Sequence, residues 1–367
     1  MKKSLAVLPV PSAKQISLRE PERIVGLDLG DRWSHYCVLD CAGGIVQEGR
    51  IRTTALGVEE WFAELPPTCI VMEAGTHSPW VSRQLQGYGH KVIVANARKV
   101  RLIYESDRKN DRLDARMLAK LGRVDVSLLA PIQHRSAQVQ TDLAVIRSRN
   151  ALVAARTQLI NAARGLVKAM GGRLPTATSA AFTHKIGASI PAAMKPVLSP
   201  LLKTIQELSR QISSYDARVE ELAQRKYPQT TLLRQVKGVG PLTALAFVLT
   251  LEDPHRFAKS RAVGCYLGLS PQQSQSGESA PQLGISKAGD RYLRRLLVQC
   301  AHYILGPFGA DTNLRRWGLK LARGGGKSGK KRAVVAVARK LAVLLHRLWV
   351  TGEVYEPLRP PQQTVAA

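Results

Sequence analysis

Five short apolar runs between residues 23 and 97 constrain the fold more than any other feature of this chain. The second and third runs are separated by Cys-Ala-Gly-Gly, a sequence typical of a hairpin turn. The last two runs follow the helical patterns VEEWFAEL and SPWVSRQLQGYG. The runs are RIVGLDLG (23–30), SHYCVLD (34–40), IVQEGRI (45–51), TCIVMEA (68–74) and KVIVANA (91–97). This order predicts three antiparallel strands, then two parallel strands reached through helices.

Three antiparallel strands followed by alternating helices and parallel strands is the element order of a ribonuclease-H-like α/β domain. In that fold the first and fourth strands are neighbours, so Asp28 and Glu73, each near a strand end, are expected side by side. We predict a helix over 98–122, on which Asp111 and Asp114 share one face because residues three apart are neighbours on a helix surface. Asp107, four residues before Asp111, is an alternative to Asp114.

Four converging carboxylates would repel one another unless a cation lay between them. Oxygen ligands without Cys or His suit Mg²⁺, with Mn²⁺ as an alternative. Each acid also has a structural interpretation: Asp28 as a strand-end cap, Glu73 as a turn residue, and Asp111 and Asp114 as salt-bridge partners of nearby arginines. We prefer the metal site, with the neighbouring cations Arg108, Lys109, Arg112 and Arg116 as phosphate contacts at its rim.

Two long helical patterns follow this domain. Val139, Ile146, Val153, Ile160 and Val167 repeat every seven residues within a proline-free stretch, 136–170. After a break rich in Gly, Pro and Thr, a second seam alternates in steps of four and three over Leu201, Ile205, Leu208, Ile212, Tyr215, Val219 and Leu222. Such seams are typical of a coiled coil. The two helices should pack as an antiparallel hairpin, or against the same helices of a second subunit.

The last third of the chain combines a glycine turn, a polar loop and basic helices. The Gly238-Val239-Gly240 turn between two helical patterns predicts a helix-hairpin-helix, whose backbone can approach a phosphate. A polar loop over 270–290 precedes a helix that opens with Arg291, Arg294 and Arg295, which could clamp a scissile phosphate. The segment RGGGKSGKK (323–331) lacks the spacing of a phosphate-binding P-loop, so we interpret it as a flexible basic loop before a final helix at about 331–349.

Charge and cysteine usage narrow the class of partner and compartment. The chain has 54 Lys and Arg against 27 Asp and Glu, a formal net charge of +27. The excess lies after residue 132, which predicts a nucleic-acid partner whose binding weakens with salt. No segment is apolar enough to span a membrane, so we expect no membrane association. Five scattered cysteines without a C-x-x-C pair indicate reduced thiols and a cytoplasmic protein.

The ordered motifs GLDLG, VMEAG, KNDRLDA, KGVGPLTA, YLGLSPQQSQSGES and GISKAGDRYLRRLL resemble one bacterial insertion-sequence family of RuvC-like DEDD transposases. The resemblance spans roughly 23–305. It implies that Asp28, Glu73, Asp111 and Asp114 hold the metal ions and that Ser276 is the nucleophile, with Ser274 and Ser279 as nearby alternatives. It further implies a bridge RNA, and a composite site made by the acids of one subunit and the serine of another in a tetramer.

The resulting hypothesis is a recombinase that exchanges DNA strands through a phosphoserine link, acts as a dimer or tetramer and works at the nucleoid. One alternative is a metal-dependent nuclease, similar to a Holliday-junction resolvase, in which water attacks. A sugar-kinase-type ATPase is disfavoured because no second phosphate loop is present. The last alternative, a non-catalytic nucleic-acid-binding protein, is disfavoured because all four acids are present.

The hypothesis assigns boundaries and contacts along the chain. The expected parts are a tail (1–21), a RuvC-like DEDD domain (22–130), a coiled-coil segment (131–228), a helical transposase domain with the helix-hairpin-helix and the serine loop (229–350), and a tail (351–367). The expected nucleic-acid contacts are Lys237, Gly238, Gly240, Lys287, Arg291, Arg294, Arg295, Lys327, Lys330, Lys331 and Arg332.

Overall fold

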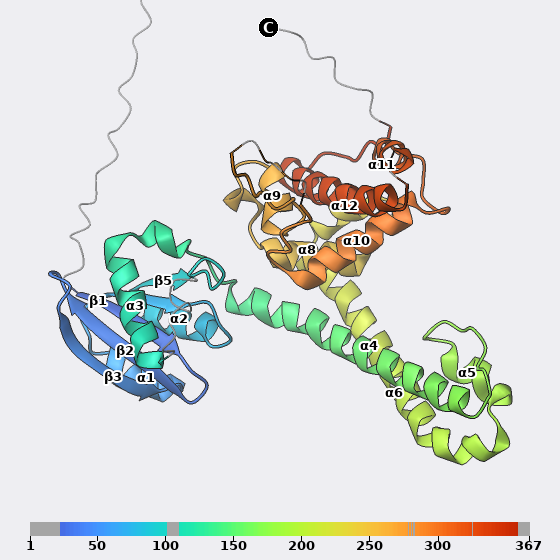
Figure 1. The fold of residues 1–367 in the computed structure, drawn as a ribbon, viewed down its shortest axis with the longest axis horizontal. Helices are drawn as coiled ribbons and strands as arrows, with labels where there is room; N and C mark the ends of the chain where they lie inside the picture. Colours follow the sequence, from blue (N-terminus) through green and yellow to red (C-terminus); the bar gives the residue numbers. More distant parts are fainter. Residues whose placement is uncertain are drawn as a thin grey trace, which may run out of the picture. The chain divides into compact units, whose positions relative to one another are not determined.

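The structure is a computed structural model that describes residues 23–100, 110–277, 279, 281, 283–324 and 326–358, without the side chain of Lys327. The chain divides into two compact units at the junction between Arg135 and Ser136, which we call the N-terminal unit and the C-terminal unit. Figure 1 shows the sheet in the first and the helices of the second. The separation predicted at residue 228 stays a prediction.

The N-terminal unit is built on a five-stranded sheet in the order β3-β2-β1-β4-β5. Strands β1, β2 and β3 are antiparallel, whereas β4 and β5 run parallel to β1. The elements are β1 (Arg23–Leu29), β2 (Trp33–Asp40), β3 (Ile45–Arg52), α1 (Ala55–Phe62), β4 (Cys69–Glu73), α2 (Ser78–Gly87), β5 (Lys91–Ala95), α3 (Asp111–Val124) and a 3₁₀ turn (Val126–Leu129). This confirms the predicted mixed sheet and the adjacency of the first and fourth strands.

Helices cover both faces of this sheet. On one face, α1 and α2 pack on an apolar layer that includes Leu27, Phe62 and Met72. On the other face, α3 lies so close to β1 that a Cβ at Gly26 would collide with the carbonyl oxygen of Ala115. The alternation of side chains along each strand therefore assigns one set of residues to each helix layer.

The helix predicted over 98–122 begins later than expected. Residues 97–99 form a turn, with the Lys99 N–H donating to the Asn96 carbonyl, and 101–109 lie outside the described residues together with Asp107, Arg108 and Lys109. The side chain of Asn110 accepts from the Arg112 N–H at 3.0 Å and so caps the first turn of α3. The cap therefore fixes the start of the helix at Asp111.

The C-terminal unit is helical. It comprises α4 (Ala137–Ala169), α5 (Phe182–Ile186), α6 (Lys195–Glu221), α7 (Thr230–Arg234), α8 (Pro241–Leu251), α9 (Arg261–Tyr266), α10 (Arg291–Leu305), α11 (Asn313–Arg323) and α12 (Gly326–Thr351). Shorter turns lie at Gly187–Ser189, Ala192–Met194 and Pro254–Arg256, and a π-helical turn at Leu222–Lys226. No helix in the described part of the chain combines the length and apolarity that crossing a membrane requires.

Two features organise this unit. The long helices α4 and α6 pack along each other within one chain (Figure 1). The ion pair of Arg149 Nε with Asp216 Oδ1 at 2.6 Å joins them. Supercoiling of this pair and the oligomerising alternative stay predictions. Helix α8 is the centre of the main core, because every residue from Thr243 to Leu251 is buried. A helix that is apolar on all sides is stable only when other helices surround it.

Candidate active site

The first two predicted acids lie on adjacent strands at the same level. The register pairs Leu27 of β1 with Met72 of β4, and Asp28 and Glu73 each follow directly after that pair. Because side chains alternate along a strand, both carboxylates point to the sheet face that α3 covers, the face of Gly26 and Val71. Both residues are partly exposed. The strand order thus brings these two acids together at the carboxyl ends of β1 and β4.

The second pair of predicted acids belongs to α3, the helix that covers this face of the sheet. Asp111 and Asp114 lie in its first turn, where the helix dipole favours negative charge. The Asp114 residue is buried, with 8% of its surface exposed, whereas the Asp111 side chain is 59% exposed. Asp111 lies close to His35, the residue that pairs with Asp28 across β1 and β2. The first turn of α3 therefore lies at the same end of the sheet as Asp28.

His35 connects the sheet to Asp111. It lies directly opposite Asp28 in the antiparallel pairing of β1 with β2, and its Nδ1 is 3.8 Å from Asp111 Oδ2. Within the described residues, this Nδ1 atom is buried and has no hydrogen-bond partner. Because His35 pairs with Asp28 and also lies near Asp111, the carboxylate of Asp111 lies at the end of the β1–β2 strand pair where β1 finishes and β2 begins. His35 was not predicted from the sequence. Its position seven residues after Asp28, across a tight turn between two antiparallel strands, could have indicated that the two residues pair.

The acids form a carboxylate set of the right chemistry for a hard divalent cation. Within the described residues, no three His, Cys, Asp or Glu side chains lie close enough together to hold a metal ion. Oxygen donors from Asp and Glu nevertheless suit Mg²⁺ or Mn²⁺ in type. Asp28, Glu73, Asp111 and Asp114 are therefore the residues that could hold such an ion by their chemistry, although the described side chains are not gathered around one point.

Glu48 on β3 anchors α3 to the sheet, a role that sequence reasoning missed. Its carboxylate, 8% exposed, accepts hydrogen bonds from Arg112 at 2.5 and 2.8 Å and from Arg116. Hydrogen bonds from Arg116, together with those from Arg112, outweigh burial and lower the pKa of Glu48 to about 2. Arg112 and Arg116 therefore hold α3 in place, which corrects their assignment as phosphate contacts. The sequence did offer one signal for this role, because Glu48 is an acid within the third predicted strand.

The serine predicted as nucleophile lies at the tip of a small hairpin. The N–H of each of Ser276 and Ser279 donates to the carbonyl of the other at 3.1 Å, and Gly277 between them has φ +55°. Further along, the Gln272 N–H donates to the Gly284 carbonyl and the Ser286 N–H to that of Ser270. Ser274, Ser276 and Ser279 are all exposed. The segment expected as a plain polar loop is thus a paired hairpin that projects its serines into solvent.

Arg294 closes the base of this hairpin. Its Nη1 donates to the carbonyls of Leu267 at 2.9 Å and Ala288 at 2.7 Å. Gly268 and Gly289 lie beside it with positive φ, and a Cβ on either would collide with backbone across the base. Arg294 therefore ties the base of the serine hairpin, and its predicted contact with phosphate stays a prediction.

The neighbouring predicted contacts on α10 differ in exposure. Arg291, Arg295 and Lys287 are exposed. Arg295 also donates to the side-chain oxygen of Asn150 and stacks over the Tyr292 ring, 4.9 Å from its centroid. Arg291 and Lys287 therefore present charge to solvent next to the hairpin, whereas Arg295 is partly engaged with α4.

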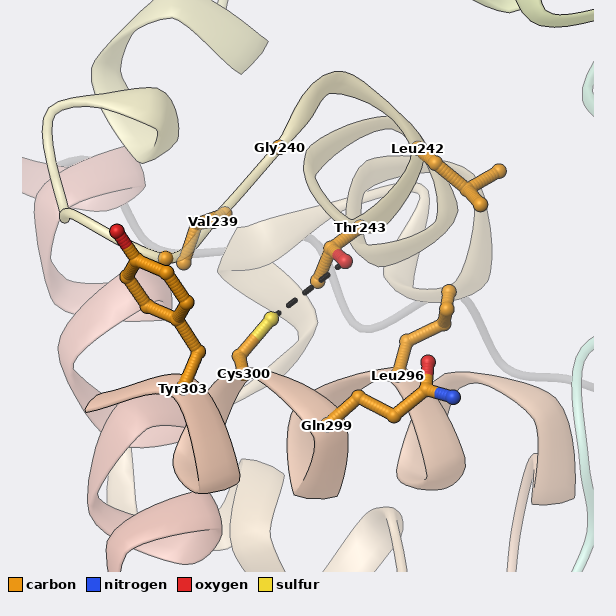
Figure 2. Close-up of a pocket in the computed structure, with 9 residues that line it drawn as sticks. Val239, Gly240, Leu242, Thr243, Leu296, Gln299, Cys300 and Tyr303 are labelled. Carbon is orange, nitrogen blue, oxygen red and sulfur yellow. Dashed lines mark hydrogen bonds between the residues drawn. The ribbon is translucent and has the colours of Figure 1, made fainter. Parts of the chain in front are cut away.

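The glycine turn before α8 borders a shallow pocket of about 480 Å³ (Figure 2). Gly238 has φ +99°, and a Cβ there would press into the Tyr303 ring of α10. Gly240 is the N-cap of α8 and has no side chain with which to cap the helix. Lys237 and Gly240 are exposed. The preceding helix α7 has only five residues, so the helix-hairpin-helix stays a prediction.

The basic segment 323–331 is mostly helical, which corrects the flexible loop expected there. Helix α12 begins at Gly326, and Gly329 is buried close to the Ala322 carbonyl at the end of α11. The small residue permits this close approach, so the helix extends back through the glycines. Lys330, Lys331 and Arg332 are exposed on its first turns, and the side chain of Lys327 lies outside the described residues.

Comparison with known proteins decides the family. Residues 230–308 match the family described as "Transposase IS116/IS110/IS902 family", and residues 25–171 match the IS110 DEDD family described as "Transposase". The chain belongs to this transposase family. Residues 25–171 contain the four acids, and residues 230–308 contain the serine hairpin. As a member, the protein is a DNA-cleaving and strand-transferring enzyme of an insertion sequence.

Relatives of similar length support this membership. The transposase for insertion sequence element IS1111A from Coxiella burnetii is 28% identical over 91% of this chain and 91% of its own length. A probable family 20 transposase from Pseudomonas aeruginosa is 29% identical over 91% of this chain and 98% of its own. The transposase for element IS1328 from Yersinia enterocolitica is 29% identical over 76% and 82%. The transposase therefore resembles these relatives along nearly its whole length.

Proposed function

We propose that this transposase exchanges DNA strands through a phosphoserine intermediate on Ser276, with divalent metal held by Asp28, Glu73, Asp111 and Asp114. The observation that carries this proposal is the grouping of the acids on the α3-covered end of the sheet, together with an exposed serine at a hairpin tip. A nuclease that used water would need the acids but not an exposed serine on its own hairpin.

In this mechanism the Ser276 hydroxyl attacks a DNA phosphodiester. A bond forms between Oγ and phosphorus as the hydroxyl loses its proton to water, the bond to one sugar oxygen breaks, and that oxygen takes up a proton and leaves with its strand. The hydroxyl of a second strand then attacks the phosphoserine, which joins the strands and frees Ser276. Bound Mg²⁺ would supply the positive charge that promotes ionisation of the serine and stabilises the leaving oxygen. Arg291 and Lys287, exposed beside the hairpin, bind the phosphates of the incoming strand.

Guidance by a bridge RNA and assembly of a composite site from two subunits belong to the same proposal. Both rest on the family resemblance, and the net charge of +27 is consistent with binding DNA and RNA together. We further propose that the enzyme acts on the bacterial nucleoid in the cytoplasm. Co-purification from cells that carry the flanking non-coding DNA, followed by sequencing of the bound RNA, tests the guide. Recovery of no specific RNA species would contradict it.

A covalent trap tests the nucleophile. A DNA substrate nicked next to the exchange site should accumulate a denaturation-resistant protein–DNA adduct on the wild-type enzyme. Ser276→Ala should abolish that adduct and strand joining, whereas Ser274→Ala and Ser279→Ala, exposed serines of the same hairpin, should retain both. Cleavage by Ser276→Ala without an adduct would indicate attack by water and refute the serine mechanism.

A matched pair of substitutions tests the metal assignment. Asp28→Asn should abolish adduct formation and weaken Mn²⁺ binding measured by electron paramagnetic resonance. Asp31→Asn, an exposed acid three residues along, should leave both unchanged. Unaltered Mn²⁺ binding by Asp28→Asn would contradict the placement of the metal.

A further inference from the structure

A long stretch without acids covers most of α4, the loop and short helix after it, and the first part of α6. From residue 143 to residue 206 the chain has no Asp or Glu, and we call this stretch the acid-free segment. It carries nine Lys and Arg residues: Arg147, Arg149, Arg156, Arg164, Lys168, Arg173, Lys185, Lys195 and Lys203. A surface of one sign of charge concentrates counterions and attracts a partner of the opposite sign.

Three of these cations serve the fold. Arg149 pairs with Asp216, and Arg156 Nη1 donates to the Ser209 hydroxyl at 3.2 Å. Arg164 donates to the carbonyls of Leu174 and Pro175 at 3.2 and 3.1 Å, and lies 5.1 Å from the centroid of the Phe182 ring. These contacts tie α4 to α6 and to the loop that follows α4. They leave six cations whose presence the packing does not explain.

The other six cations are exposed. They are Arg147, Lys168, Arg173, Lys185, Lys195 and Lys203, and no ion pair to any of them occurs among the described residues. Lys168 is compatible with the negative end of the α4 dipole, so its charge has a local structural role. Lys195 is the first residue of α6, where the same dipole disfavours a cation. Helix stability therefore does not account for the set.

The segment that carries these charges has its own folded core. A cluster of buried side chains separate from the main core joins the end of α4, α5 and the start of α6: Ile160, Ala163, Val167, Leu174, Phe182, Ile186, Ile190, Met194, Leu198 and Ile205. Figure 1 shows α5 beside the ends of the two long helices. The cations are thus presented by a packed structure with defined spacing, unlike those of a basic tail.

Part of this surface is concave. A pocket of about 530 Å³ is lined by Arg164, Lys168 and Arg173 with Gly171, Gly172 and Leu174. Gly171 adopts φ +77°, which turns the chain sharply after α4 and brings Arg173 beside Lys168. Three basic side chains around one hollow match the geometry in which a chain of phosphates is bound, since each phosphate can accept from more than one donor.

We propose that the acid-free segment is a binding surface for the phosphate backbone of a polynucleotide, in addition to the contacts of the C-terminal helices. Charge complementarity selects this occupant over a second copy of the same segment, because two such surfaces would repel one another. The proposal assumes only that the transposase binds nucleic acid and is independent of the serine chemistry. DNA and structured RNA share the phosphate chemistry, and the experiment separates them.

The test compares two triple variants of the full-length protein that remove equal charge. Lys185→Gln, Lys195→Gln and Lys203→Gln neutralise the acid-free segment and lower the net charge from +27 to +24 by removing three cations. Arg210→Gln, Arg225→Gln and Arg347→Gln make the same change at exposed arginines that already pair with acids. Binding to a DNA duplex and to a folded RNA is measured by fluorescence anisotropy between about 50 and 200 mM salt.

The segment variant should reduce the slope of log K against log salt by about 2 to 3 for at least one polymer, because each lost phosphate contact removes about 0.7 to 0.9. The control variant should keep the wild-type slope. The polymer that loses more affinity identifies the occupant. Equal slopes for the segment variant and wild type, or equal losses in both variants, would overturn the proposal. A loss confined to anionic lipid vesicles would also overturn it.

Two further measurements keep these outcomes interpretable. Lys168→Gln with Arg173→Gln, which changes the concave part alone, should reduce the slope by about 1 to 2, provided that its thermal unfolding matches wild type. Adduct formation on Ser276 is measured at saturating DNA, where the segment variant should react at the wild-type rate. If the wild-type enzyme formed no adduct, the serine mechanism would be refuted, and the binding result would still stand.

Discussion

Glu48 and Arg116 form a partly buried ion pair that joins β3 to α3, the helix that carries Asp111 and Asp114. Arg112 binds the same carboxylate from one turn earlier. Packing at Gly26 sets the distance of α3 from the sheet, and this ion pair fixes the direction in which its first turn points. The position of the two helical acids therefore depends on a residue that takes no part in the reaction.

Neutralising Glu48 should destabilise the N-terminal unit. Glu48→Gln removes the shared counter-charge of two partly exposed guanidinium groups, so the free energy of unfolding of this unit should fall by about 1 kcal/mol. Hydrogen exchange of the β1 and β2 amides reports on this unit alone. Glu207→Gln removes an exposed pair with Arg210 on α6 and should change no amide measurably. Equal protection of these amides from exchange in wild type and Glu48→Gln would show that packing alone holds α3 on the sheet.

The same pair predicts an acid-sensitive unit. Its pKa of about 2, against an ordinary value of 4.5, means that the ionised Glu48 stabilises the folded state. This contribution is complete above about pH 4.5 and is lost as the pH falls toward 2. Thermal unfolding of the N-terminal unit should therefore shift to lower temperature across that window. Glu48→Gln should show a smaller shift, and an unchanged shift would assign the acid sensitivity to other carboxylates.

Gly26→Ala should displace α3. The new Cβ meets the backbone of Ala115 and Ala119, which a helix cannot move aside without leaving the sheet. Overpacking of this kind costs about 1–3 kcal/mol or more. We expect lost DNA cleavage with retained DNA binding by the C-terminal unit. Gly87→Ala at the end of α2, where a Cβ meets nothing within 4 Å, should behave as wild type. If Gly26→Ala cleaved DNA at the wild-type rate, the position of α3 would not matter for the reaction.

Arg294→Lys should loosen the serine hairpin without a large loss of DNA affinity. Both the Leu267 and the Ala288 carbonyl accept from the one Nη1 atom, which the rigid guanidinium places between them, whereas the ammonium of lysine lies on a shorter, flexible side chain. The amides of Ser286 and Lys287, which donate across the hairpin, should exchange faster, and strand joining should slow. Arg291→Lys, at an exposed position on the same helix, serves as the control for amide exchange alone, because Arg291 is itself a proposed phosphate contact. Unchanged exchange at both amides would contradict a structural role for Arg294.

Local signals explain which parts of the site could be predicted. Alternating apolar residues and the glycine-rich turn defined β1 to β5, and the strand order then placed Asp28 beside Glu73. The seven-residue spacing likewise predicted that the helices of residues 136–170 and 201–222 pack together. These signals act within one element or between sequence neighbours, so a single sequence carries them.

Other features depended on contacts that no local signal carries. Arg112 and Arg116 were taken for phosphate contacts because their partner, Glu48, lies more than sixty residues earlier. The structural contacts of Arg294 could not be predicted, because the carbonyls it binds are backbone atoms, which the sequence does not distinguish. The helix through Gly326 and Gly329 forms because α11 packs against it, which overrides the weak helix propensity of glycine.

The sequence by itself determined the strand order, the two acids at the strand ends, the charge of the C-terminal unit and the family pattern, since each is a property of neighbouring residues or of composition. Only the tertiary structure decided which cations remain available for nucleic acid and which are used within the fold. Ion pairs form between residues far apart in the chain, so the partner of each arginine became known only when the helices had been packed.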